Sequence, residues 1–92
     1  MRVHVSALAR RDIIRLAAFL GAKSPVAADR ALDGIEIALF SLSEMAGRGY
    51  RGPHEGERQL FVRFGRGGYV IQYEVGPAVV IVLRIFHSLE GR

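Results

Sequence analysis

Three side chains in the C-terminal half of the chain, Arg58, Arg84 and His87, could together act on a phosphodiester. Cleavage of RNA without a metal requires a base for the 2′-hydroxyl, an acid for the leaving oxygen and cations for the phosphate. His87 could be the acid or the base, because imidazole gains and loses a proton near neutral pH. Arg58 and Arg84 could hold the phosphate, with Arg63 and Glu57 nearby in the sequence. These residues form one candidate catalytic site.

The same residues also have a purely structural interpretation. Arg84 interrupts the most apolar stretch of the chain, residues 78–86, and a buried charge must be compensated by a partner. Glu57 and Glu74 are the carboxylates we expect to pair with it. His87, at the end of that stretch, would then be a surface histidine. Both interpretations stay open at the level of sequence.

The charge of the chain favours an acidic partner. Thirteen bases and nine acids give a net charge of +4, and Lys23 is the only lysine. Residues 1–46 hold six bases and five acids, whereas residues 47–92 hold seven bases and four acids. A basic C-terminal half suits nucleic acid or an acidic protein segment, and it also suits a merely solubilising surface.

Several classes of protein are disfavoured by what the sequence does not contain. There is no cysteine, and the three histidines do not have metal-site spacing, so we expect no disulfide, metal or cofactor. No glycine-rich phosphate loop precedes a helix. The most apolar run, residues 79–83, is far shorter than the roughly 20 residues of a membrane span. We expect a cytoplasmic protein that does not contact a membrane.

Two amphipathic helices are predicted after a short strand at residues 2–5. Ser6 can cap the first helix, and Gly21 can end it. Ser24 followed by Pro25 is a strong start signal for the second helix, which should run to about Met45. Apolar residues recur at three- and four-residue spacing in both helices. They are Ala9, Ile13, Leu16, Ala17 and Leu20, then Ala28, Leu32, Ile35, Leu39 and Leu42.

The second half of the chain reads as strands. Residues 47–56 contain four glycines and one proline, which predicts an irregular loop. Residues 58–64 and 69–75 alternate with a period of two, and residues 78–86 are apolar on both faces. Short turns between them indicate an antiparallel meander. The sequence therefore predicts one α+β domain over residues 1–92. Its order is β-α-α-β-β-β, with an antiparallel helical hairpin packed on a mostly antiparallel four-stranded sheet.

Four large side chains are candidates for contact with a partner. Ile37 and Phe40 fall outside the apolar stripe of the second helix, so they should be exposed and could meet a segment of a partner protein or a second copy of this chain. Tyr69 and Tyr73 share one face of a predicted strand. They could belong to the core, or they could stack on a ligand from an open sheet.

The order of elements and several short motifs resemble the RelE/ParE toxin superfamily, also called plasmid-stabilisation proteins. The match spans nearly the whole chain, and the second-helix opening and the closing Arg-x-x-His favour its ParE branch. The matching segments are residues 24–30 ("SP-x-AA-x-R"), Gly47-Arg48, 57–60 ("R-x-L"), 69–75 ("Y-V-I-x-Y-x-V") and 80–87 ("V-x-I-L-R-V-x-H").

The resemblance implies a growth-inhibiting toxin of a type II toxin–antitoxin system, forming a hetero-oligomer with a small ParD-like antitoxin. In such systems the antitoxin wraps the toxin and binds operator DNA, so the toxin itself would reach DNA only through its partner. ParE-type toxins inhibit DNA gyrase, and RelE-type toxins cut mRNA on the ribosome. If the chain has such an antitoxin, we expect its contacts at the four large side chains identified above, Ile37, Phe40, Tyr69 and Tyr73.

Which target this chain would act on stays open, because both branches share one fold. We expect gyrase inhibition, with target contacts at Arg84, His87 and Arg92 and no enzymatic activity. Against a nuclease, the only lysine lies between the helices and no tyrosine follows His87. A messenger-RNA endonuclease using Arg58, Arg84 and His87 is the alternative. A second alternative is an inactive homologue that only binds antitoxin.

Overall fold

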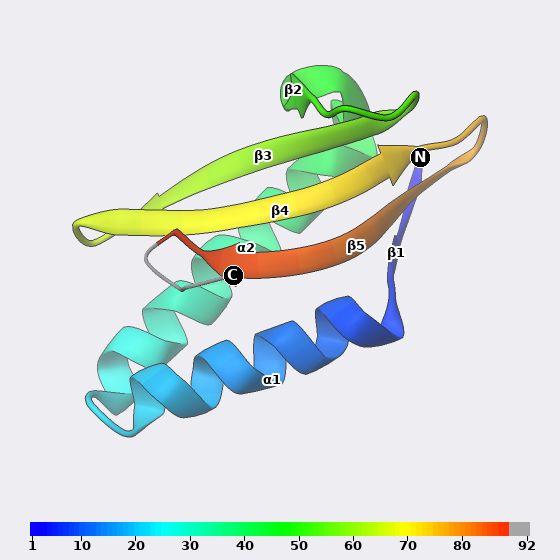
Figure 1. Cartoon of the computed structure of the whole chain (residues 1–92). Helices are drawn as coiled ribbons and strands as arrows, with labels where there is room; N and C mark the ends of the chain where they lie inside the picture. Colours follow the sequence, from blue (N-terminus) through cyan, green and yellow to red (C-terminus); the bar gives the residue numbers. More distant parts are fainter. Residues whose placement is uncertain (89–92) are drawn as a thin grey trace.

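The computed structural model of the chain describes residues 1–88 and contains two α-helices and a five-stranded sheet (Figure 1). The predicted α+β class and order of elements are confirmed. The elements are β1 (Arg2–Val5), α1 (Ala7–Gly21), α2 (Pro25–Glu44), a 3-10 turn η1 (Ala46–Arg48), β2 (Tyr50–Arg51), β3 (Glu57–Phe64), β4 (Gly67–Val75) and β5 (Val79–His87).

The sheet has the order β1-β5-β4-β3-β2, and only the β1–β5 pair is parallel. Both helices lie on one side of it, with α1 alongside β5 and α2 crossing beneath the other strands (Figure 1). Within the described residues, no helix covers the other side of the sheet, and we call it the open side (Figure 1). Neither helix is both long and apolar enough to cross a membrane.

Both helices begin where the sequence predicts. The Ser6 hydroxyl accepts a hydrogen bond from the Ala9 N–H at 3.1 Å, and the Ser24 hydroxyl accepts one from the Ala27 N–H at the same distance. These contacts satisfy N–H groups that have no partner within the first turn of a helix. Pro25 occupies the first turn of α2, where its missing N–H costs nothing.

The core lies between the helical hairpin and the helix-facing side of the sheet. The apolar stripes of α1 and α2 meet alternate residues of β4 and β5, as the two periodicities require. The largest fully buried side chains are Tyr69, Tyr73, Leu42, Ile71, Ile85, Val80 and Val82.

The glycine-rich segment after α2 is more ordered than its composition predicts. It contains η1 and the two-residue strand β2, which adds a fifth strand to the predicted four. The Tyr73 hydroxyl donates to the Ala46 carbonyl at 2.7 Å and accepts from the Gly49 N–H at 2.9 Å. Gly49 approaches so closely that a Cβ there would lie 2.6 Å from that hydroxyl. Long-range contacts with β4 therefore order a segment that lacks local preference.

A β-bulge in β5 changes which residues face the core. Gln72 pairs with Arg84 and Tyr73 with Val82, so Leu83 is an extra residue in the ladder. Val82 and Ile85 are both fully buried, although strict alternation would place them on opposite sides. Without the bulge, Arg84 would follow Val82 onto the helix-facing side.

Candidate functional site

The three catalytic candidates do not form a cluster. Strand pairing places Arg58 opposite Tyr73 and His87 opposite Tyr69, both on the helix-facing side. The two tyrosines are four residues apart on β4, about 13 Å along the strand. Arg84 belongs to the open side. A single phosphate group therefore could not contact all three side chains in this arrangement.

Arg58 is engaged with the backbone of the segment that precedes it. Its guanidinium donates to the carbonyls of Gly47 at 3.2 Å and Gly49 at 2.8 Å. These contacts, with those of Tyr73, hold η1 and β2 against the sheet. Arg58 thus has a structural role that the sequence did not indicate.

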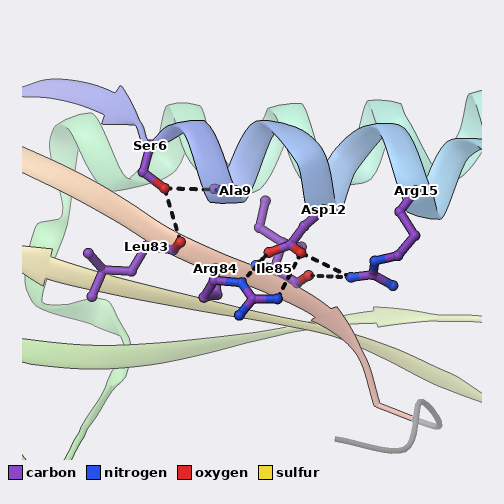
Figure 2. A network of polar contacts seen from close by, with 7 residues as sticks. All are labelled: Ser6, Ala9, Asp12, Arg15, Leu83, Arg84 and Ile85. Atoms are coloured by element: carbon purple, nitrogen blue, oxygen red, sulfur yellow. Dashed lines mark hydrogen bonds and ion pairs between the residues drawn. The ribbon is translucent and has the colours of Figure 1, made fainter.

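Arg84 forms an ion pair with Asp12 of α1 (Figure 2). The Arg84 guanidinium donates to both carboxylate oxygens, at 2.8 and 3.1 Å, and its carbon lies 4.9 Å from the centre of the Phe86 ring. The prediction that Arg84 is paired with a carboxylate was correct in kind. The predicted partners, Glu57 and Glu74, were wrong, because the bulge and the position of α1 bring the guanidinium to Asp12.

The same contacts show how α1 completes the edge of β5. β1 pairs with β5 only as far as Val82, so beyond that residue no strand within residues 1–88 pairs with this edge. Side chains of α1 and its cap take its place (Figure 2). The Ser6 hydroxyl donates to the Leu83 carbonyl at 3.0 Å, Asp12 accepts from the Ile85 N–H at 2.8 Å, and Arg15 donates to the Ile85 carbonyl at 3.4 Å. Covering an edge in this way prevents unwanted strand pairing there.

Asp12 is charged in this environment despite being almost wholly buried. Burial acts to raise its pKa, but hydrogen bonds from Arg84, the Ile85 N–H and Arg15 outweigh burial, and the pKa lies below the ordinary value of an aspartate. Sequence reasoning missed this residue. A signal was present, since Asp12 lies three residues after Ala9 and four before Leu16, on the buried stripe of α1. An acid in such a position requires a cationic partner.

Tyr69 and Tyr73 belong to the core and not to a partner-binding surface. Both side chains are buried, and Tyr69 packs against Phe64 and edge-on against His87, with ring centres 5.6 and 5.2 Å apart. The prediction that they contact an antitoxin was wrong in this structure, because their rings face the helices. His87 is half-buried beside Tyr69.

Ile37 and Phe40 project from the outer face of α2, with 71% and 68% of their surface exposed. Beside them, a groove of about 270 Å³ runs between α1 and α2 and is lined by Ile13, Leu32, Ile35, Glu36 and Leu39. The outer face of the hairpin therefore offers apolar surface to a partner. The remaining target-contact candidate, Arg92, lies outside the described residues.

Comparison with known proteins identifies the family. The family model described as the ParE toxin of the type II toxin–antitoxin system parDE matches residues 3–91. The chain belongs to the ParE toxin family. It is a type II toxin, and its system includes an antitoxin partner.

Two curated relatives of this ParE-family toxin come from Caulobacter vibrioides. Toxin RelE3 is 42% identical over 90 residues, which cover 98% of this chain and 97% of the relative. Toxin RelE1 is 41% identical over 90 residues, which cover 98% and 96%. The fold also matches a solved chain of the chromosomal ParDE system from P. aeruginosa, with a TM-score of 0.80 and 20% identity over 95% of each chain.

Proposed function

We propose that this toxin stops growth without cleaving RNA, by inhibiting DNA gyrase, and that a ParD-like antitoxin neutralises it. One observation supports the part of the proposal that concerns RNA cleavage. Arg84 is bound to Asp12 at 2.8 Å, and neither Arg58 nor His87 lies on the same side of the sheet.

The chemistry of cleavage explains why this separation matters. A general base, a general acid and phosphate-binding cations must all lie within hydrogen-bond reach of one reacting group. Moving Arg84 to such a position would leave Asp12 as a buried and unpaired charge. A toxin that acts only by binding a target protein does not need an acid, a base and cations close to one reacting group. Arg84, His87 and Arg92 remain the proposed target contacts.

A messenger-RNA endonuclease is the second candidate. It is favoured by the names of the curated relatives, which are RelE toxins at 41–42% identity. Under this alternative, the ribosome would have to rearrange the site around His87. The third possibility, a homologue that only binds antitoxin, is distinguished by the same experiment.

The antitoxin would bind to the outer face of the helical hairpin. Ile37 and Phe40 supply exposed apolar surface, and the groove between α1 and α2 continues it. Operator DNA would be bound by the antitoxin and not by this chain. The complex would be a hetero-oligomer.

Expression of the toxin alone, under a tightly controlled promoter, tests the proposal. Growth arrest with induction of the DNA-damage response, and loss of supercoiling by purified gyrase on addition of toxin, is the expected result. Arrested translation with new 5′ ends in mRNA would overturn it in favour of the endonuclease. Unimpaired growth with intact antitoxin binding would overturn it in favour of the inactive homologue.

A further inference from the structure

The outer face of the helical hairpin holds most of the exposed apolar surface of the molecule. Ten large apolar side chains are clearly exposed within residues 1–88, and six of them belong to α1 or α2. Ile14 of α1 and Ile37 and Phe40 of α2 are the most exposed of these six, at 69%, 71% and 68%. Apolar surface gathered on one face of a small domain marks a place where another molecule binds.

The charged side chains of this face divide between the two helices by sign. The exposed charges of α1 are all positive, because its one acid, Asp12, is buried against β5. They are Arg10, Arg11 and Arg15. By contrast, α2 exposes four acids and one base, which are Asp29, Asp33, Glu36, Glu44 and Arg30. The hairpin therefore presents a positive half beside a negative half.

These two sets of charges do not neutralise each other within the chain. Neither Arg10 nor Arg11 forms an ion pair among residues 1–88, and the four acids of α2 have no cationic partner there. Arg10 donates instead to the Val5 carbonyl at 3.3 Å. Both halves of the face can therefore form ion pairs with charges of another molecule.

The division by sign favours a second copy of this chain as the partner. An acidic partner would be attracted to α1 and repelled by α2, and a basic partner would meet the reverse. A second copy carries both signs in the required places. Because α1 and α2 lie side by side as an antiparallel hairpin (Figure 1), a two-fold axis parallel to them places α1 of each copy over α2 of the other. Both contacts then join opposite charges.

We propose that the free toxin forms a two-fold homodimer through the outer face of its helical hairpin. The arginines of α1 in one copy face the acids of α2 in the other, and Ile14, Ile37 and Phe40 are covered between them. The length of α1 and the usual spacing of packed helices give a shared face on the order of 500 Å². A stable complex buries roughly 800 Å² on each partner, so we expect a weak dimer with a dissociation constant on the order of 10 µM or higher.

The dimer does not depend on the proposed function, because only toxin chains take part in it. Its competition with the antitoxin does rest on the proposed function. If the antitoxin binds the same face of the hairpin, the two associations share Ile37 and Phe40 and exclude each other. The antitoxin would then have to separate the dimer, and free toxin would cover its own apolar face.

Sedimentation velocity of the isolated full chain, from about 1 to 200 µM, measures the association. We expect a monomer–dimer equilibrium that weakens about threefold or more as salt is raised, because exposed ion pairs are screened. Reversing one charge on either helix, by Arg11→Glu or Asp33→Arg, should weaken the dimer about tenfold or more, since each change occurs twice in a two-fold interface. An equimolar mixture of the two variants should regain an affinity within about threefold of wild type, because both contacts again join opposite charges.

The matched controls carry the same changes of charge away from the hairpin. Arg63→Glu on β3 and Glu74→Arg on β4 alter exposed side chains, and each should leave the dissociation constant within about twofold of wild type. If a charge reversal on the hairpin unfolds the chain, Ile14→Ser provides a second variant. It changes no charge and should weaken the dimer about tenfold or more, because it removes apolar surface from the interface twice.

The proposal is overturned if wild type remains monomeric throughout the concentration series. It is also overturned if either reversal variant associates as wild type does, or if the mixture of the two variants fails to recover affinity. Neither result bears on gyrase inhibition, which is measured by supercoiling and does not require the toxin to dimerise.

Discussion

Replacing Asp12 by Asn should destabilise the fold and change its response to pH. Asp12 is the centre of the network that joins α1 to β5, and it accepts from Arg84, Arg15 and the Ile85 N–H. The Asn side chain has nearly the same shape. It retains one acceptor oxygen, but it loses the charge and points an amide N–H₂ toward one of the cations.

The expected loss is about 2–3 kcal/mol of unfolding free energy. Hydrogen bonds to charged groups contribute about 1.5–3 kcal/mol each, and breaking a fully buried ion pair costs about 3–5 kcal/mol. The Asp12 side chain is 4% exposed but that of Arg84 is 39% exposed, so solvent screens the pair and the lower part of this range applies. A domain of this size has a stability of roughly 5–14 kcal/mol, so the loss is a large fraction of it.

The pH dependence has a definite sign. The pKa of Asp12 is lower in the folded protein than in the unfolded chain, so its contribution is fully present above the unfolded value of about 3.9. As pH falls below that value, the unfolded state binds a proton first and the contribution is lost. The Asn variant lacks this titration. The difference in stability between wild type and variant should therefore be constant from pH 7 to about pH 5 and narrow below pH 4.

Urea denaturation followed by circular dichroism at pH 7 and pH 3 measures both effects. Asp33→Asn, on the exposed face of α2, is the matched control and should change stability by less than about 0.5 kcal/mol. The reasoning is refuted if Asp12→Asn at pH 7 is no more destabilising than this control, or if its effect is as large at pH 3 as at pH 7.

Three further predictions follow from single contacts. Phe40→Ser should weaken antitoxin binding at least tenfold, as measured by calorimetry. The free energy of unfolding should change by less than about 0.5 kcal/mol, because the Phe40 side chain is exposed. An equal loss of affinity on replacing the exposed Leu8 of α1 by Ser would contradict a specific contact at Phe40. Tyr73→Phe should lower the free energy of unfolding by about 1–2 kcal/mol, because it removes the hydroxyl that hydrogen-bonds to Ala46 and Gly49. Hydrogen exchange at the Gly49 amide should become faster for the same reason. An unchanged exchange rate would show that the order of this segment does not depend on the hydroxyl. Gly34→Ala should stabilise the protein by about 0.5–1 kcal/mol in urea denaturation, since a Cβ at this position of α2 meets nothing within 4 Å. Gly49→Ala should destabilise the protein by more than about 1 kcal/mol, because a Cβ there would collide with the Tyr73 hydroxyl. Similar effects of the two substitutions would contradict this packing.

The positions of the elements were predictable because their signals are local. Ser6 and Ser24 were identified as helix caps from residue type and the pattern that follows, and both make the expected contact. The spacing of apolar residues within a segment is enough to predict a helix or a strand, and no knowledge of the neighbouring segments is needed. The exposure of Ile37 and Phe40 followed from the same periodicity.

The arrangement of the basic residues was not predictable, because it depends on strand pairing. The alternation of apolar residues along β5 cannot reveal a bulge. Leu83 is an extra residue only in relation to the pairing of β5 with β4. That one residue decides that Arg84 lies on the open side of the sheet.

The sequence by itself therefore determined the fold class, the order of the elements and the exposed face of α2. Only the tertiary structure decided that Arg84 pairs with Asp12, 72 residues away, and that Arg58 and His87 lie apart. The physical reason is that periodicity records which side of its own element a residue occupies, whereas charge pairing depends on which elements become neighbours.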